Sequence, residues 1–361
     1  MIIKTLSVAG FRNLKEQNFV PGQGCNVIFG ENAQGKTNLL EAIWLFTGGK
    51  SFRGAKENEM ISFDGPFAKL EMNFESEGRP QKMAVRLTQG KEVFLNGVKC
   101  RSSADVVGKL GCVVFSPVHL NLVKEGPALR RRFMDGAICQ MKPSYLSLLN
   151  EYRRALLSRS ALLKDCQYHA ELLDTLDVWD SQLAGLGAAI VKSRKEFVMQ
   201  LSLAAVEIYG GISRGKEQLS LHYESTVEEN EEYHQSFLKA LQNSRALDLK
   251  NKTTGIGPHR DDLSLLIDGA SARSFGSQGQ QRSCVLALKL AEAALMEYLF
   301  NEKPVILLDD VLSELDKNRQ QYVLNKLSGF QVFITCCEKE NFEGLTDGAL
   351  FLMESGRLSA V

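Results

Sequence analysis

The chain has 361 residues, 44% of them apolar and 24% charged, which is the composition of a globular protein with one large or two ordinary domains. Basic and acidic residues number 43 each, so a net charge of zero says nothing for or against a polyanionic partner. No apolar run reaches the roughly 20 residues of a membrane span, and the first residues lack a secretory signal pattern. The eight cysteines form no CxxC pair, so we expect reduced thiols, no zinc site and a cytoplasmic location.

The first third of the chain has the pattern of short strands with one early helix. Apolar runs predict strands at 2–9, 25–29 and 112–117 and a helix at 37–47. Alternating, turn-rich sequence from 67 to 115 predicts an antiparallel meander with a turn at Asn96-Gly97.

The segment "GENAQGKT", residues 30–37, lies between the expected strand and helix and matches the GxxxxGK[ST] phosphate-binding loop. Its glycines allow backbone N–H groups to face a polyphosphate, and the helix start adds a positive dipole. Lys36 would reach the β- and γ-phosphates and Thr37 would bind Mg²⁺, whereas the alternative is an ordinary glycine-rich turn. The predicted contacts are Gly30, Glu31, Asn32, Ala33, Gln34, Gly35, Lys36, Thr37 and Asn38.

The middle of the chain changes to helical spacing, and the end returns to alternating strands and helices. Residues 127–210 are predicted to be a helical insertion, followed by a strand at 219–223 and a helix near 231–243. The later elements are strands at 263–267, 304–308, 331–335 and 349–353 and helices at 280–300 and 317–328.

Two carboxylates end the apolar run "VILLDD", residues 305–310. A buried strand that delivers Asp309 beside Thr37 would complete a Mg²⁺ site, since Mg²⁺ prefers one or two carboxylates with phosphate and water. Asp310 would then stand where a carboxylate can activate water. Acidic residues at the end of a strand are common and alone indicate no metal site. Together with the phosphate-binding loop at 30–37, they predict one.

The stretch "SFGSQGQQRS", residues 274–283, places a hydroxyl and bare backbone N–H groups before a strongly helical run. Ser277 and Gly279 could therefore form a second anion site, and the alternative is that Ser277 only caps the helix. A second anion site without its own lysine is best explained if it serves a neighbouring copy of the chain.

The pattern predicts a discontinuous α/β domain from residues 1–123 and 250–361, with a helical lobe at 124–249 inserted between its halves. The segments "GENAQGKT", "SQGQQR" and "LLDDVLSELD" together resemble the head of ABC-type ATPases in the branch that contains SMC proteins. The segments "GFRNL", "GPHRDD", "FSP" and "RRRFMD" narrow the resemblance to the RecF recombination-mediator family.

This resemblance implies an ABC-type ATPase head with an antiparallel meander, an α/β fold in which two heads sandwich two ATP molecules. Ser277, Gly279 and Gln280 would then contact the γ-phosphate of the partner's ATP. Asp316 would lie at the dimer interface, and Arg12 near the nucleotide. The family also implies an ATP-dependent homodimer that binds gapped DNA or single-strand/double-strand junctions and works with RecO and RecR to load RecA. Its ATP hydrolysis is slow.

Three features depart from the wider ABC pattern. Asp310 stands where most members have Glu, as is typical of RecF proteins, and its shorter reach predicts modest turnover. Cys336 follows the strand at 331–335 where transporter ATPases have His, and residues 116–121 contain no Gln. These departures disfavour a transporter subunit, and an insertion this short disfavours an SMC-like structural organiser.

A basic cluster lies in the lobe, where residues 124–164 hold nine Lys and Arg against three acids. Such a cluster favours sequence-independent binding to DNA phosphates. The alternatives are a solvated helix face balanced by acids such as Glu228, Glu229, Glu231 and Glu232, or structural pairing of Arg130–Arg132. The motif at 257–262 is expected to brace the signature segment through His259, Arg260 and Asp261. The predicted DNA contacts are Arg130, Arg131, Arg132, Arg153 and Arg154.

Overall fold

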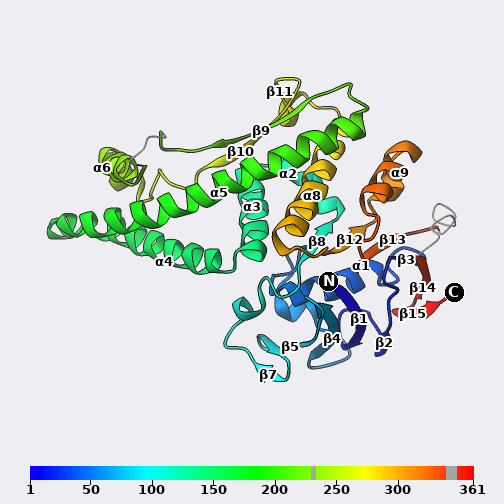
Figure 1. The fold of residues 1–361 in the computed structure, drawn as a ribbon. Coiled ribbons are helices and arrows are strands. Elements are labelled where there is room, and N and C mark those ends of the chain that lie inside the picture. The colour runs from blue at the N-terminus through cyan, green and yellow to red at the C-terminus, as the bar shows by residue number, and fades with distance from the viewer. Residues whose placement is uncertain (229–232, 339–347) are drawn as a thin grey trace. The chain divides into compact units, whose positions relative to one another are not determined.

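The computed structural model describes residues 1–228, 233–338 and 348–361, and the chain forms two compact units (Figure 1). Unit 1 contains Met1–Asn121, Ala204–Gln218 and Gln278–Val361, and unit 2 contains Leu122–Leu203 and Leu219–Ser277. Helix α5 (Leu176–Ser213) contributes to both units. Across these described ranges no helix combines the length and apolarity that crossing a membrane requires.

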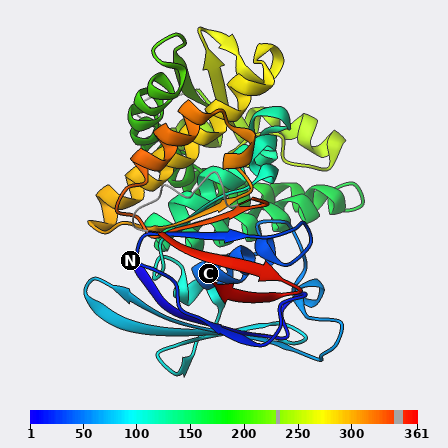
Figure 2. The ribbon, with the colours of Figure 1, turned by 90° about the vertical axis from the view of Figure 1, so that its right-hand side faces the viewer.

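Unit 1 contains an antiparallel sheet with the strand order β2-β1-β4-β5-β6-β7, drawn in blue and cyan along the lower side of Figure 2. Along β4 and β5, buried residues alternate with more exposed ones, as expected of strands with one face on the core. Asn96 and Gly97 both have positive φ, 49° and 83°, so the predicted hairpin turn forms there. The strands are β1 (Ile2–Ala9), β2 (Gln17–Phe19), β4 (Ala68–Ser76), β5 (Arg79–Leu87), β6 (Lys91–Leu95) and β7 (Val98–Lys99).

The second sheet of unit 1 has the order β15-β14-β3-β13-β12-β8, and its strands are parallel except for β15. Strands β8, β12 and β13 are buried along their whole length, which explains their continuous apolar sequence. The strands are β3 (Cys25–Phe29), β8 (Cys112–Phe115), β12 (Val305–Asp309), β13 (Val332–Cys336), β14 (Gly348–Glu354) and β15 (Arg357–Ala360).

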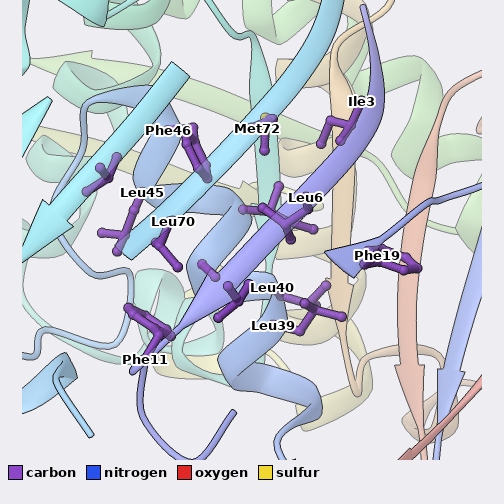
Figure 3. Close-up of a cluster of buried hydrophobic side chains, with 14 of the residues drawn as sticks. Ile3, Leu6, Phe11, Phe19, Leu39, Leu40, Leu45, Phe46, Leu70 and Met72 are labelled. Carbon is purple, nitrogen blue, oxygen red and sulfur yellow. The ribbon is translucent and has the colours of Figure 1, made fainter. Parts of the chain in front are cut away.

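One hydrophobic core joins the two sheets of unit 1 through helix α1 (Lys36–Trp44). Figure 3 shows side chains of β1 and β4, including Leu6 and Leu70, gathered with Leu39 and Leu40 of α1. The helix is thereby fixed at its apolar face, and its N-terminus is placed at the end of β3. The other helical segments of unit 1 are η1 (Leu45–Thr47), η2 (Glu57–Met60), η3 (Ser103–Val106), η4 (Pro117–Leu120), the last part of α5, α8 (Gln278–Phe300), η6 (Leu312–Glu314) and α9 (Lys317–Lys326).

Unit 2 is mostly helical, as predicted for the insertion, and also contains a small antiparallel sheet of β11, β10 and β9. Its elements are α2 (Asn121–Lys124), α3 (Pro127–Met141), α4 (Ser144–Asp165), η5 (Ala170–Thr175), the first part of α5, β9 (Leu219–Glu224), α6 (Tyr233–Asn251), β10 (Asp262–Ile267), β11 (Ala270–Ser271) and α7 (Ala272–Phe275). The expected helix near 231–243 corresponds to α6. Residues 231 and 232 of the expected helix lie outside the described ranges.

These units differ from the predicted domains in three stretches, the shortest of which is residues 122–123, predicted in the α/β domain but part of unit 2. Residues 250–277, predicted in the α/β domain, belong to unit 2 because β10 pairs with β9. Residues 204–218, predicted in the helical lobe, belong to unit 1. The alternation of apolar and polar residues predicts that β10 is a strand, but it does not predict which strand it pairs with.

Candidate functional site

The predicted phosphate-binding loop connects β3 to α1, as the motif requires. Gly30 and Gly35 have φ of 145° and 121°, and a Cβ on Gly30 would lie 2.4 Å from the carbonyl oxygen of Met353. Glycine is therefore required at Gly30. Lys36 Nζ donates hydrogen bonds to the carbonyl oxygens of Gly30 at 2.5 Å and Glu31 at 2.8 Å. The ammonium group is thus held inside the curve of the loop, at the start of a helix.

Thr37 and Asp309 lie in direct contact, although 272 residues separate them. The Thr37 hydroxyl donates to Asp309 Oδ1 at 2.7 Å, and the hydroxyl of Thr335 on the adjacent strand donates to the same oxygen at 3.0 Å. Burial raises the pKa of Asp309 above its usual value, and the two hydroxyls partly oppose this shift. A hydroxyl and a buried carboxylate side by side fit the oxygen ligands that Mg²⁺ prefers.

Asp310 has a left-handed backbone with φ of 53°, which turns the chain sharply after β12. Its backbone N–H donates to Thr335 Oγ1 at 2.9 Å, and the Ser313 hydroxyl donates to its Oδ1 at 2.9 Å. Because only Asn, Asp and Gly tolerate this conformation well, the local fold itself favours Asp here. Its carboxylate is oriented by Ser313, and Asp310 lines the same cleft as Lys36 and Thr37.

The cleft has a volume of about 890 Å³, in the range of small-molecule sites. Arg12 lines it, and its guanidinium group donates to Glu41 at 2.9 and 3.1 Å and to the Glu59 carbonyl at 3.0 Å. Arg53 also lines the cleft and donates to Asn38 Oδ1 at 2.9 Å. We did not predict Arg53, since a single Arg in a loop has no spacing that would reveal it.

Six of the nine predicted loop contacts line the cleft: Asn32, Ala33, Gly35, Lys36, Thr37 and Asn38. Gln34 instead accepts a hydrogen bond from the Ser355 N–H at 2.6 Å and so holds the hairpin of β14 and β15. The Glu31 carbonyl accepts from Lys36, and its side chain is exposed. Gly30 acts through its conformation.

The signature segment lies at the start of α8, which begins at Gln278, directly after Ser277. Gly279 and Gln280 therefore belong to the first turn of the helix, where backbone N–H groups have no partner within the helix. Gln280 Nε2 donates to Glu217 Oε1 at 2.9 Å. The side-chain amide that was predicted to contact a γ-phosphate is therefore bound to a carboxylate of its own chain in this structure.

Cys336 lies within β13, and burial raises the pKa of its thiol to about 12. This thiol is neutral at physiological pH. The exposed Cys337 follows, with its Sγ 3.2 Å from Asn32 Oδ1 of the phosphate-binding loop.

Comparisons with known proteins agree with this geometry. The model of the RecF/RecN/SMC N terminal domain matches residues 2–356. The DNA replication and repair protein RecF of Agathobacter rectalis is 43% identical over 344 residues, which cover 95% of this chain and 94% of that relative. The chain belongs to the RecF family of DNA replication and repair proteins.

Solved structures agree with membership of the RecF family. A structure of the recombination mediator protein RecF-ATP in the RecFOR pathway matches with a TM-score of 0.93 and 37% identity, over 100% of this chain and 97% of that one. An Smc head domain from Pyrococcus furiosus, bound to the C-terminal domain of ScpA, matches with a TM-score of 0.57. Its identity is 17%, over 100% of this chain and 96% of that one, so this likeness shows the fold alone.

The predicted DNA contacts of this RecF family member fall into two groups. Arg130 is 5% exposed, and its Nε and Nη2 donate to Asp262 at 2.7 and 2.8 Å. Arg130 therefore has the structural pairing that was the alternative to DNA binding, and it is not available to contact DNA. Arg131 donates to the Asp261 carbonyl at 2.7 Å and is partly exposed. The remaining candidates, Arg132, Arg153 and Arg154, are exposed.

The "GPHRDD" motif of residues 257–262 is a polar hub inside unit 2. His259 Nδ1 lies 2.8 Å from the Tyr152 hydroxyl, and the Asp261 carboxylate accepts from the Tyr223 and Thr226 hydroxyls at 2.6 and 2.9 Å. Arg194 of α5 donates to the Pro258 carbonyl at 2.6 Å. The motif therefore joins helices α4 and α5 to the sheet of unit 2. The expected bracing of the signature segment by His259, Arg260 and Asp261 stays a prediction.

Arg159, another member of the basic cluster, is completely buried in unit 2 and should contribute to stability. Its guanidinium donates to Asp180 at 2.6 Å and to Asp248 at 2.7 Å. Arg159→Ala would leave the buried Asp248 without this cation and Asp180 with Arg245 alone, and we expect it to lower the free energy of unfolding by about 3–5 kcal/mol. Urea denaturation would measure this loss. As a control, Arg153→Ala removes an exposed arginine of the same helix and should change the free energy of unfolding by less than about 0.5 kcal/mol.

Proposed function

We propose that the protein is an ATP-dependent DNA clamp that closes when two copies bind ATP. The observation that supports this most directly is the contact of Thr37 with Asp309 beside Lys36, in a cleft large enough for a nucleotide. The RecF structure described with ATP gives the same expectation.

The proposed nucleotide site assigns one task to each group. Lys36 would exchange its bonds with the loop carbonyls for bonds to the β- and γ-phosphates, since its ammonium already lies at the loop that would surround them. Thr37 and Asp309 would hold Mg²⁺, which supplies neutralisation of phosphate charge. For this, the Thr37 hydroxyl must turn its proton away from Asp309.

Asp310 is proposed as the base that orients and activates the attacking water. We expect Asp310→Asn to bind ATP normally and to lower kcat for hydrolysis by about 100-fold or more, because the amide cannot accept the proton. The amide oxygen can still accept the Ser313 hydrogen bond, so the loop should keep its conformation. Single-turnover hydrolysis measured with saturating ATP would test this, with Ser313→Ala as a variant that disturbs only the orientation. If Asp310→Asn hydrolysed ATP at the wild-type rate, Asp310 could not be the base.

The clamp is proposed to bind DNA phosphates through exposed and partly exposed arginines of unit 2, without reading sequence. The proposed surface contains Arg131, Arg132, Arg153 and Arg154. The physiological targets would be gapped DNA and single-strand/double-strand junctions in the cytoplasm, with RecO and RecR as partners in loading RecA. This reading follows the RecF relatives and the RecFOR pathway in which the solved RecF acts.

Reversing two of these charges should weaken DNA binding. We expect Arg153→Glu/Arg154→Glu to lower duplex affinity about 10-fold or more and to reduce the slope of log K against log[salt] by about 1–2. Fluorescence anisotropy across a salt series would measure both quantities. The matched control is Arg79→Glu/Lys82→Glu on exposed positions of β5. Equal effects of both double variants would indicate general charge repulsion and no local contact surface.

A further inference from the structure

A carboxylate just beyond helix α5 holds the first turn of α8. Glu217 Oε1 accepts a hydrogen bond from Gln280 Nε2 at 2.9 Å, and Glu217 Oε2 accepts one from the Tyr209 hydroxyl at 2.7 Å. Tyr209 is completely buried within α5. The carboxylate is thus fixed on one side by a rigid ring and bound on the other to the signature segment.

The backbone that carries Glu217 is also fixed. The Gly215 N–H donates to the Gly210 carbonyl at 2.8 Å, and the Ser213 hydroxyl donates to the Glu217 carbonyl at 3.2 Å. Arg214 and Gly215 have φ of 57° and 71°, which is the left-handed ending of a helix. Glu217 is therefore presented to α8 by a hydrogen-bonded cap.

A hollow of about 580 Å³ lies beside this cap in unit 1. It is lined by Glu217 and also by Asp316, the residue whose segment resembles the D-loop, and by Arg319 and Tyr322 of α9. The group that holds the signature segment and the segment expected at the dimer interface thus border the same space.

We propose that Glu217 is a positioning residue for the capping of a second copy's ATP. By holding Gln280, it fixes the first turn of α8, so that the N–H groups of Gly279 and Gln280 are arranged before the partner's phosphate arrives. Such pre-organisation strengthens association because less ordering remains to be done on binding. This inference rests on the proposed ATP-dependent dimer.

Three variants separate positioning from charge and from general stability. Glu217→Ala removes both hydrogen bonds and should raise the dissociation constant of the ATP-bound dimer about tenfold. Glu217→Gln should dimerise nearly as wild type, because its amide oxygen can accept from Gln280 and its N–H can donate to the Tyr209 oxygen. Glu207→Ala is the matched control on α5, since Glu207 pairs with Lys326 on the surface at 3.0 Å. It should leave dimerisation unchanged.

Sedimentation velocity with ATP and Mg²⁺ measures the dimer, and a fluorescent ATP analogue at low protein concentration measures binding to the monomer. Support requires weaker dimerisation by Glu217→Ala with monomer ATP affinity within about twofold of wild type, and recovery in Glu217→Gln. The role is overturned if Glu217→Ala dimerises as tightly as wild type, or if its ATP affinity and unfolding temperature fall together with dimerisation. A wild-type protein that stays monomeric with ATP would instead overturn the proposed clamp itself.

Discussion

Lys36→Met should lose nucleotide binding while the protein stays folded. Lys36 is the cation of the phosphate-binding loop, and its Nζ sits 2.5 Å from the Gly30 carbonyl, inside the loop that would surround the phosphates. Removing charged hydrogen bonds to phosphate costs about 3 kcal/mol, which is about a 100-fold loss of affinity. Hydrolysis and ATP-dependent dimerisation should disappear with binding. Titration with a fluorescent ATP analogue would measure the affinity directly.

The control for this experiment is Lys50→Met, an exposed lysine that does not line the cleft. It should bind nucleotide as wild type does. The folded state of Lys36→Met is checked by its unfolding temperature, because the loop carbonyls lose their lysine partner in this variant. Retention of wild-type affinity in a folded Lys36→Met protein would place the nucleotide elsewhere in the molecule.

Features set by neighbouring residues could be predicted from the sequence. The loop of residues 30–37, its flanking strand and its helix are local, and the structure confirms all three elements. The turn at Asn96-Gly97 is equally local, since both residues tolerate positive φ. The meeting of Thr37 with Asp309 was predicted only because two motifs of known geometry fix where each strand ends.

Features set by distant partners could not be predicted in the same way. Arg130 stood in a run of three arginines, and nothing local shows that its partner is Asp262, 132 residues later. The bond between Gln280 and Glu217 likewise joins residues 63 apart. From the sequence alone, a charged side chain is predicted to be exposed to solvent. Its burial can be predicted only when its partner of opposite charge is known.

The boundary between the two units has the same physical origin. An alternating strand such as β10 can pair at the edge of any sheet, and its pairing with β9 moves it into unit 2. Helix α5 continues without interruption through Leu203 and Ala204, so no turn signal marks the change of unit.

Ser277→Arg should separate ATP binding from dimerisation. Lys36, Thr37 and Asp310 line the cleft of the chain's own nucleotide site, and no residue of the signature segment 277–280 contributes to that lining among the described residues. A nucleotide bound there should therefore keep its affinity for the monomer. In the proposed clamp, Ser277 faces the γ-phosphate of the partner's ATP, so a long arginine there would hold the second copy away. We expect normal ATP binding and at least a tenfold weaker ATP-dependent dimer by sedimentation velocity.

The matched control is Ser274→Arg, three residues earlier in the same polar stretch and also exposed. It adds the same charge and bulk, and it should dimerise like wild type. A difference between the two variants therefore reports position and not charge. Equal dimerisation by Ser277→Arg and wild type would show that the signature segment does not cap a partner's ATP. In that case the first turn of α8 would only begin the helix, which is the alternative that the sequence left open.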